Sequence, residues 1–371
     1  MYKFDKRIVM TLDAGGTNFV FSAMQSNEEI VNPICLPSNA DVLEKCLQTL
    51  VDGFTQVKAQ LHEEPVAISF AFPGPADYVN GVIGDLPNLK AFRGGIALGP
   101  FLKEKFGIPV FINNDGDLFA YGEAIAGILP EINQKMAEAG SSKRYKNLLG
   151  VTFGTGFGGG VVTNGKLHMG DNGAGGDVWV FRHKKQRNCI TEESVGVAAI
   201  KRMYSEFSGN TTDDLSPKDI CQIASGAKAG DKEAALKTFA ELGEEAGDTI
   251  AHAITIVDGL VVIGGGLTGA AEFFMPALLN ELNGTIGRLN GDSFPRLQMK
   301  AFDLSNAEQL EAFIKGSSTL VSIPGTNKMT SYNSEKRIGV AVSKLGASKA
   351  IALGAYAFAL NEMDVAAEQN I

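Results

Sequence analysis

Several features that mark whole classes of protein are missing from this sequence. Its 371 residues contain no apolar run of the roughly 18 residues that a membrane-spanning helix requires. The first residues lack an apolar stretch followed by a cleavage site, so we expect no signal peptide. The four cysteines show no CxxC spacing, which fits a reducing compartment: Cys35, Cys46, Cys189 and Cys221. We therefore expect a cytoplasmic protein that contacts no membrane.

A basic patch is also missing, because 33 Lys and Arg residues stand against 42 Asp and Glu residues. The net charge of −9 is unfavourable for binding DNA or RNA, so we expect no nucleic-acid partner. A Walker loop is absent as well, since the Gly165-Lys166 pair is followed by Leu167 instead of Ser or Thr. Any bound phosphates would have to be held in another way.

Glycine, by contrast, is abundant and clustered. The chain has 44 glycines, against a usual frequency of ~7 %. Apolar runs at 7–12 and 19–24 flank the glycine-rich residues 13–17, which predicts two strands joined by a tight turn. The same pattern recurs at 148–168, around residues 154–156. We therefore expect two related halves, and the length fits two domains.

The spacing of apolar residues predicts the remaining elements. Helices are expected over 41–60, 98–106, 116–128, 191–207, 231–257, 268–283 and a closing segment at 347–363. Strands are expected over 66–72, 108–113 and 259–266, the last ending in glycines, and Asn164-Gly165 predicts a type I′ hairpin turn. The polar residues 130–146 look like a surface insertion. Residues 303–344 predict a helix followed by a loop rich in Ser, Gly and Asn.

The two glycine turns are candidate phosphate sites. A turn built from glycines points several backbone N–H groups into one concavity, which favours an anion. The first turn offers Gly15, Gly16 and the Thr17 hydroxyl, with Asp13 placed to hold hydrated Mg²⁺. The second offers Gly154, Thr155 and Gly156. The alternative is that both are tight hairpin turns without a ligand, but a third cluster, Gly264-Gly265-Gly266, favours the functional interpretation.

Two segments match GxGxxG, the pattern of dinucleotide-binding proteins, which leaves a dehydrogenase as an alternative. In the first, Gly154, Gly156 and Gly159 precede a strand instead of a helix. The second begins at Gly264 and does lie between a strand and a helix. Its nearest strand-end acid, Asp303, lies far beyond the ~20 residues expected. The glycines at 264–266 fit the border of an adenine ring better.

Asn113, Asn114 and Asp115 follow the apolar strand residues 108–112. A carboxylate at the end of a strand and before a helix lies where α/β sheets place their ligands. Asp115 is therefore a candidate base for a substrate hydroxyl, and Asn114 a candidate hydrogen-bonding group for a polyol. The alternative, with at least equal weight, is that either residue caps the following helix.

These motifs, taken in order, resemble the ROK family of bacterial sugar kinases and sugar-responsive repressors. The resemblance covers nearly the whole chain and includes Pro73-Gly74-Pro75. It implies an α/β, actin-like ATPase fold, with two ribonuclease-H-like domains around a cleft. It also implies an ATP-dependent kinase acting on a hexose or hexose derivative, with ATP and Mg²⁺ and Asp115 as general base. Phosphates would bind at Asp13, Gly15, Gly16, Thr17, Gly154, Thr155 and Gly156, adenosine at Gly265 and Gly266, and sugar at Gly74, Asn88, Asn114, Asp115, Asp177 and Glu192.

The sequence departs from the family pattern around residues 176–193. Asp177 stands where the family usually has Glu, Val180 where it has a zinc-binding His, and Cys189 alone remains of three zinc-binding cysteines. We therefore expect no zinc, with packing of residues 179–181 in its place, and glucose to be a poorer substrate than another sugar. Glu193 is the alternative to Glu192, Asn18 replaces a common Lys, and His183 and His252 are interpreted as a surface and a structural histidine.

The expected domains are 1–117 with 348–371 and, between them, 118–347. A second interpretation is a sugar-sensing regulator without catalysis. It is disfavoured by the acidic charge, by the short segment before Asp13 and by the presence of Asp115 and both turns. The resemblance implies a homodimer, while the sequence leaves the sugar and the phosphorylated hydroxyl open.

Overall fold

The computed structural model describes residues 1–86, 89–210 and 214–369, and these form two compact units. Unit 1 comprises residues 1–127, 160–176 and 345–371, and unit 2 comprises residues 128–159 and 177–344. The units differ from the predicted domains because residues 118–127, which include most of the helix that begins at Asp115, and residues 160–176 group with unit 1. No helix in the described part of the chain is long and apolar enough to cross a membrane.

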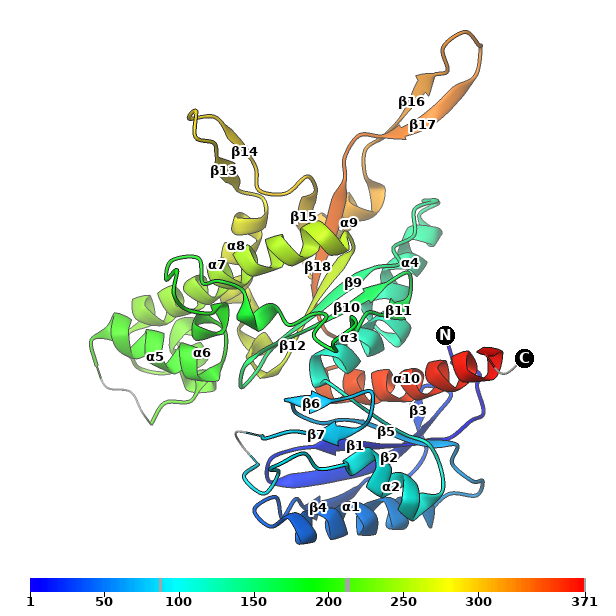
Figure 1. Ribbon diagram of the computed structural model, residues 1–371. Coiled ribbons are helices and arrows are strands. Elements are labelled where there is room, and N and C mark those ends of the chain that lie inside the picture. The colour runs from blue at the N-terminus through cyan, green and yellow to red at the C-terminus, as the bar shows by residue number, and fades with distance from the viewer. Residues whose placement is uncertain (87–88, 211–213, 370–371) are drawn as a thin grey trace. The chain divides into compact units, whose positions relative to one another are not determined.

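Unit 1 contains a sheet with the order β3-β2-β1-β5-β8, and β4 pairs with β2 (Figure 1). β1 and β2 form an antiparallel hairpin in which Asp13 faces Val20, whereas β1, β5 and β8 are parallel. The carboxyl ends of these three parallel strands therefore lie at one edge of the sheet. The strands are β1 (Val9–Ala14), β2 (Asn18–Gln25), β3 (Glu28–Glu29), β4 (Ile34–Pro37), β5 (Ala67–Ala71) and β8 (Val110–Asn113).

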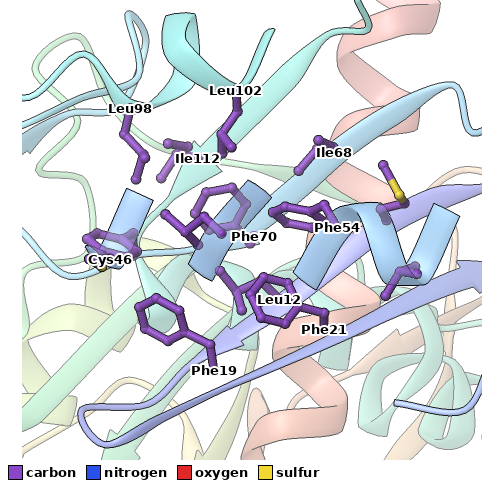
Figure 2. Close-up of a cluster of buried hydrophobic side chains, with 14 of the residues drawn as sticks. Leu12, Phe19, Phe21, Cys46, Phe54, Ile68, Phe70, Leu98, Leu102 and Ile112 are labelled. Carbon is purple, nitrogen blue, oxygen red and sulfur yellow. The ribbon is translucent and has the colours of Figure 1, made fainter. Parts of the chain in front are cut away.

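Helices cover both faces of the unit 1 sheet because residues along β1 alternate between two apolar cores. Met10 and Leu12 belong to the core beneath α1 (Leu43–Lys58) and α2 (Leu98–Phe106). Figure 2 shows this core, where Phe19, Phe21, Phe54 and Phe70 lie together. Val9 belongs to the other core, against α10 (Ala347–Gln369).

Two glycines bring α3 (Asp115–Ala126) into close contact with α10. A Cβ on Gly122 would lie 1.9 Å from the carbonyl oxygen of Ala350, and a Cβ on Gly354 would lie 1.9 Å from that of Leu118. The two backbones can approach this closely only without side chains at these positions. This packing explains why α3 belongs to unit 1. It also fixes the position of α3, whose first residue is Asp115.

The second sheet has the order β11-β10-β9-β12-β18-β15. β12 is parallel to both β9 and β18, and β15 is parallel to β18. The chain passes from unit 2 into unit 1 within β10. The strands are β9 (Leu148–Phe153), β10 (Phe157–Thr163), β11 (Lys166–Leu167), β12 (Leu260–Gly264), β15 (Lys300–Asp303) and β18 (Arg337–Val342).

The helices of unit 2 include a long one, α7, which packs against α5 and α8. They are α4 (Ile128–Glu138), α5 (Val197–Ser208), α6 (Pro217–Ser225), α7 (Lys232–Val257), α8 (Ala271–Leu282) and α9 (Ala307–Lys315), with 3₁₀ helices η1 (Val178–Val180), η2 (Thr191–Ser194) and η3 (Gly266–Ala270). Local signals set some of their ends: Ser216 forms a capping box with Asp219 at the start of α6.

Three segments differ from the sequence prediction. Residues 130–146 are not simply a polar insertion, because α4 buries Ile132 and Met136. Residues 303–344 contain α9, as expected, but also the exposed hairpin β16 (Ser318–Ser322) and β17 (Met329–Asn333) and the buried strand β18. Residues 191–207 form η2 and then α5 rather than one helix. Two further short hairpins are β6 (Ala76–Asp77) with β7 (Val82–Ile83), and β13 (Thr285–Gly287) with β14 (Ser293–Pro295).

Candidate active site

Unit 1 brings most of its predicted site residues to one edge of its sheet. Met10 pairs with Ile68 and Ala71 pairs with Asn113, so counting along the register places Asp13 level with the ends of β5 and β8. Gly74 follows β5, and Asn114 and Asp115 follow β8. Asn88, the remaining predicted sugar contact of this unit, lies outside the described residues.

The first glycine turn, between β1 and β2, is exposed and held from behind. Asp13, Gly15, Gly16 and Thr17 all reach the surface. The N–H of the buried residue Ser38 donates to the carbonyl oxygen of Thr17 at 2.9 Å, and its hydroxyl donates to that of Gly16 at 2.8 Å. Because both carbonyl oxygens are bound to Ser38, neither of them is left as a free acceptor that would repel an anion at the turn. Sequence reasoning missed Ser38, since nothing in its local sequence indicates this contact.

Asn114 and Asp115 begin α3, and the structure resolves which of them is the cap. Asn114 has extended backbone angles and its side-chain oxygen accepts a hydrogen bond from Gly116 N–H at 2.7 Å. Asn114 is therefore the N-cap, which was one of the two interpretations. Asp115 is the first helical residue and its side chain is exposed, with Oδ1 accepting a 2.8 Å hydrogen bond from Gly116 N–H.

The environment of Asp115 changes its acidity. Although Asp115 is exposed as a residue, many protein atoms surround its carboxyl, and this partial loss of solvation raises the pKa of the carboxyl, while hydrogen bonds from backbone N–H groups partly offset the rise. A carboxyl with a raised pKa is a stronger base when ionised than an ordinary aspartate. Its position and acidity therefore suit proton transfer from a bound hydroxyl.

Asn113, just before the cap, is a buried polar residue that the sequence analysis did not single out. Its side-chain oxygen accepts from Asn114 N–H at 2.8 Å, and its Nδ2 donates to the sulfur of Met169 at 3.2 Å. It therefore fixes the strand end from which Asn114 and Asp115 project.

In unit 2 the second glycine turn, between β9 and β10, is braced by the chain that follows η2. Gly154 N–H donates to the carbonyl oxygen of Gly156 at 3.0 Å, and Val197 N–H donates to that of Gly154 at 3.0 Å. The carboxylate of Glu192 accepts a 2.8 Å hydrogen bond from Phe157 N–H. Glu192 therefore lies directly beside the turn, while Glu193 is exposed. Thr155 is exposed at the tip.

The third glycine cluster meets the second turn at the same edge of the unit 2 sheet, because Gly264 pairs with Thr152. Gly265 has a positive φ of 94°, and a Cβ there would lie 2.3 Å from the carbonyl oxygen of Phe153. Gly265 is thus required by the close approach of two backbones. Gly266 is exposed and has open space beside it, which leaves it accessible to a ligand.

Asp177 is the first residue of the segment 177–196, which also contains Glu192 and ends at Gly196. Its side chain is half-buried and makes no capping hydrogen bond to η1. Trp179 and Val180 are exposed, so the expected apolar packing of residues 179–181 is wrong for these two. His183 is 5 % exposed, so its interpretation as a surface histidine is also wrong. His252, interpreted as structural, is exposed instead.

No cluster of three or more His, Cys, Asp or Glu side chains suited to a metal ion occurs among the residues that the structure describes. All four cysteines are free. The zinc-free state stays a prediction. Asp13 fits a hydrated Mg²⁺ that is held mainly by nucleotide phosphates, because its carboxylate is exposed beside the first turn.

Known proteins share both the sequence pattern and the fold. The model of the ROK family matches residues 9–290. Glucokinase from Parabacteroides distasonis, known from a crystal structure, is 57 % identical with a TM-score of 0.88, over 97 % of this chain and 99 % of that one. Glucokinase from Thermotoga maritima is 26 % identical over 295 residues, which are 72 % of this chain and 84 % of that protein.

A ROK family glucokinase from Streptomyces griseus, crystallised with glucose and AMPPNP, has 16 % identity and a TM-score of 0.61, over 94 % of this chain and 98 % of that one. At this identity the likeness shows the fold alone, which is the mixed α/β architecture. The family match over most of the chain confirms the resemblance that the ordered motifs carried. This chain therefore belongs to the ROK family.

Proposed function

We propose that this protein is an ATP-dependent sugar kinase in which Asp115 deprotonates the accepting hydroxyl. The observation that carries the proposal is the position of Asp115. It is an exposed carboxylate at a strand end, on the sheet edge that also holds the first glycine turn. The 57 % identity to a protein named glucokinase supports the reaction class.

The reaction needs few covalent contributions from the protein, because positioning and charge stabilisation account for most catalysis of phosphoryl transfer. The sugar oxygen forms a bond to the γ-phosphorus of ATP, and the bond from that phosphorus to the oxygen bridging to the β-phosphate breaks. ADP leaves with the electron pair. Asp115 takes the proton from the sugar hydroxyl, and Asn114 orients the sugar with its side-chain amide.

The phosphates of ATP are assigned to backbone N–H groups of the two glycine turns. Gly16 and Gly154 support this assignment, since neither has a protein atom in the space where a Cβ would stand. Mg²⁺ bound with the nucleotide would neutralise phosphate charge, and Asp13 would hold it through water. Gly266 would border the adenosine.

The assignment of ATP to both glycine turns uses residues of both units, and it leads to a proposal about the fold. We infer that each unit is a ribonuclease-H-like domain and that together they form the actin-like ATPase fold, with ATP and sugar bound by both. The parallel strands and the paired glycine hairpins, one in each sheet, support this inference. Location in the cytoplasm and a homodimer remain predictions.

We propose glucose as the substrate. The sequence alone favours another sugar, because Asp177 is shorter than the usual Glu and Val180 cannot hydrogen-bond to a sugar. The name of the 57 % identical relative supports glucose. Because that relative aligns with 97 % of this chain, its name outweighs the two substitutions at Asp177 and Val180. In this proposal Asp177 and Glu192 bind the sugar hydroxyls, with Gly74 beside them.

One assay tests the proposal. Purified protein is incubated with ATP and Mg²⁺ and with glucose, mannose, galactose, glucosamine or N-acetylglucosamine, and both ADP and sugar phosphate are measured. We expect glucose to give the highest kcat/KM. If another hexose exceeds it, the reaction class stands and the substrate is wrong. The kinase proposal itself fails if ADP formation does not depend on an added sugar, or if no sugar in the panel gives any ADP.

A further inference from the structure

The segment 177–196 of unit 2 carries two residues that we assign to the sugar, Asp177 and Glu192. Its backbone folds back on itself. Arg182 and Ile190 form an isolated bridge, His183 N–H donates to Cys189 at 3.0 Å and Thr191 N–H donates to Phe181 at 2.8 Å. In this chain no cysteine cluster is present in the segment to hold this fold with a metal, so its anchor must lie elsewhere.

The anchor on the segment itself is His183, whose ring is buried. Its Nδ1 accepts hydrogen bonds from the backbone N–H groups of Lys185 and Gln186, both at 3.1 Å. Its Nε2 lies 2.8 Å from the hydroxyl of Ser194. Because Nδ1 accepts, the neutral ring carries its hydrogen on Nε2 and donates it to Ser194. His183 thus joins the turn at 185–186 to the residue two positions after Glu192.

The partner of His183 is Glu245 on α7, which is almost fully buried. Its Oε1 accepts a 2.7 Å hydrogen bond from Lys184 N–H. Its Oε2 lies 3.3 Å from Nδ1 of His183 and accepts no hydrogen bond of normal distance and angle among the described residues, while the nearby Thr191 hydroxyl stabilises the ionised carboxylate only in part. Two buried acceptor atoms that face each other repel unless a proton lies between them.

We propose that Glu245 is held in its protonated form, donates that proton to Nδ1 of His183, and thereby positions the segment that carries Asp177 and Glu192. His183 and Glu245 are positioning residues in this account, because neither is assigned a contact to sugar or ATP. The assigned roles of Asp177 and Glu192 rest on the proposed function, whereas the proton shared by the pair does not.

The acidity of both groups agrees with this geometry. Burial raises the pKa of Glu245 to about 7, and burial also lowers the pKa of His183. Each shift favours the neutral form, which means a carboxylic acid beside a neutral imidazole. Glu245 therefore loses the shared proton near neutral pH. Its ionised carboxylate then faces the lone pair on Nδ1 of His183.

Several of the charged groups around His183 and Glu245 form ion pairs. Lys184 contacts Glu244 at 2.7 Å, and Lys185 contacts Glu241 at 2.6 Å. Arg202 of α5 donates to the carbonyl of Glu193. Among the described residues, the charged and titratable groups around the pair include Glu241, Glu244, Asp248, Glu281, Lys184, Lys185, Glu193, Arg202, Arg296 and His252. Phe181 of the segment also contacts the ring of His252, so a transition is assigned to Glu245 by comparison with Glu245→Gln.

The sequence supplies a reporter for the test. Trp179 is the only tryptophan of the chain and lies in η1, between Asp177 and His183. Its fluorescence reports the segment without any sugar or nucleotide. The variant to compare is Glu245→Gln, because the amide oxygen can still accept from Lys184 and the amide nitrogen donates to Nδ1 at every pH. Glu233→Gln, on an exposed residue in the first turn of the same helix, is the matched control.

In the wild type and in Glu233→Gln we expect Trp179 emission to change between pH 6 and pH 8, with a midpoint at about 7. The KM for the sugar should rise over the same range, with little change in the KM for ATP. Glu245→Gln should remove both changes. Glu245→Leu should raise the sugar KM at every pH, on the order of tenfold to a hundredfold, because it leaves the segment misplaced.

The melting temperature gives a second readout. The pKa of Glu245 is raised by folding, so its contribution to stability is present at acid pH and lost as the pH rises through about 7. The wild type should thus lose more stability from pH 6 to pH 8 than Glu245→Gln. If Glu245→Gln keeps the fluorescence and stability transitions of the wild type, the shared proton is refuted. If these transitions behave as expected but no sugar is phosphorylated, only the proposed function fails.

Discussion

Ser38 binds the carbonyl oxygens of two successive turn residues, Gly16 through its hydroxyl at 2.8 Å and Thr17 through its N–H at 2.9 Å. Ser38 follows β4, whose last residue pairs with the first residue of β2. A residue of the neighbouring strand end therefore fixes the turn that we assign to phosphate.

Ser38→Ala should weaken ATP binding without preventing folding. It removes the hydroxyl bond to Gly16 and keeps the backbone bond to Thr17. The loss of one hydrogen bond costs about 0.5–1.5 kcal/mol, so we expect the KM for ATP to rise about two- to tenfold. The KM for the sugar should change little. Steady-state kinetics with each substrate varied in turn would test this, and an unchanged KM for ATP would separate Ser38 from nucleotide binding.

Gly16→Val should abolish nucleotide binding while the protein remains folded. A Cβ on Gly16 meets no protein atom within 4 Å, so the substitution has little reason to destabilise unit 1. A bound phosphate would approach the same space and be blocked. Gly287→Val, also with open space at its Cβ, is the control in hairpin β13–β14. Calorimetry with a non-hydrolysable ATP analogue gives the answer, and equal affinity in both variants would remove the first turn from the phosphate site.

Zinc should be absent from the purified protein and unnecessary for its stability. The segment 177–196 is held by His183, Glu245 and the Lys184 and Lys185 ion pairs, which need no metal. A structural zinc contributes about 10 kcal/mol or more of apparent binding energy, so its removal would be obvious. Elemental analysis should find far less than one zinc per chain, and EDTA should leave the melting temperature unchanged. One zinc per chain with unfolding in EDTA would contradict this prediction.

The pH profile should reflect the acidity of Asp115. A general base works in its ionised form, and loss of solvation raises the pKa of this carboxyl above the ordinary aspartate value. The acid limb of kcat/KM for the sugar should therefore have an apparent pKa clearly above ~3.9. An acid limb at the ordinary aspartate value, measured where the protein is folded, would show that a different group limits the rate.

Elements with a strong local pattern could be predicted from the sequence, and so could the residues at their ends. The apolar strand before Asn114 and the hairpin around Gly15 and Gly16 required only period and turn chemistry. The glycine turns and Asp115 therefore lie at strand ends, as expected. The family resemblance was predictable because these turns recur in a fixed order.

Contacts between distant segments could not be predicted in this way. Glu245 lies in the interior of a long helix, and only the packing of α7 against the segment 177–196 places it beside His183. His183 stands in the basic run 182–187, which indicates a surface until the fold buries its ring. Strand β18 was missed because it follows a polar hairpin, although its own run of apolar residues is typical of a buried parallel strand.

The central claim is that Asp115 is the general base, and Asp115→Asn tests it most directly. The pKa of Asp115 is raised in the folded protein, so its contribution to stability is present at acid pH and lost as the pH rises. At pH 7 the neutral amide of the variant should therefore be at least as compatible with the fold as the ionised carboxylate. We measure single-turnover phosphorylation of glucose by wild type and variant, together with the affinity for an ATP analogue and the melting temperature. The account predicts an unchanged affinity, an equal or higher melting temperature and a rate about 10²–10⁴-fold lower. A folded variant with nearly the wild-type rate would contradict it.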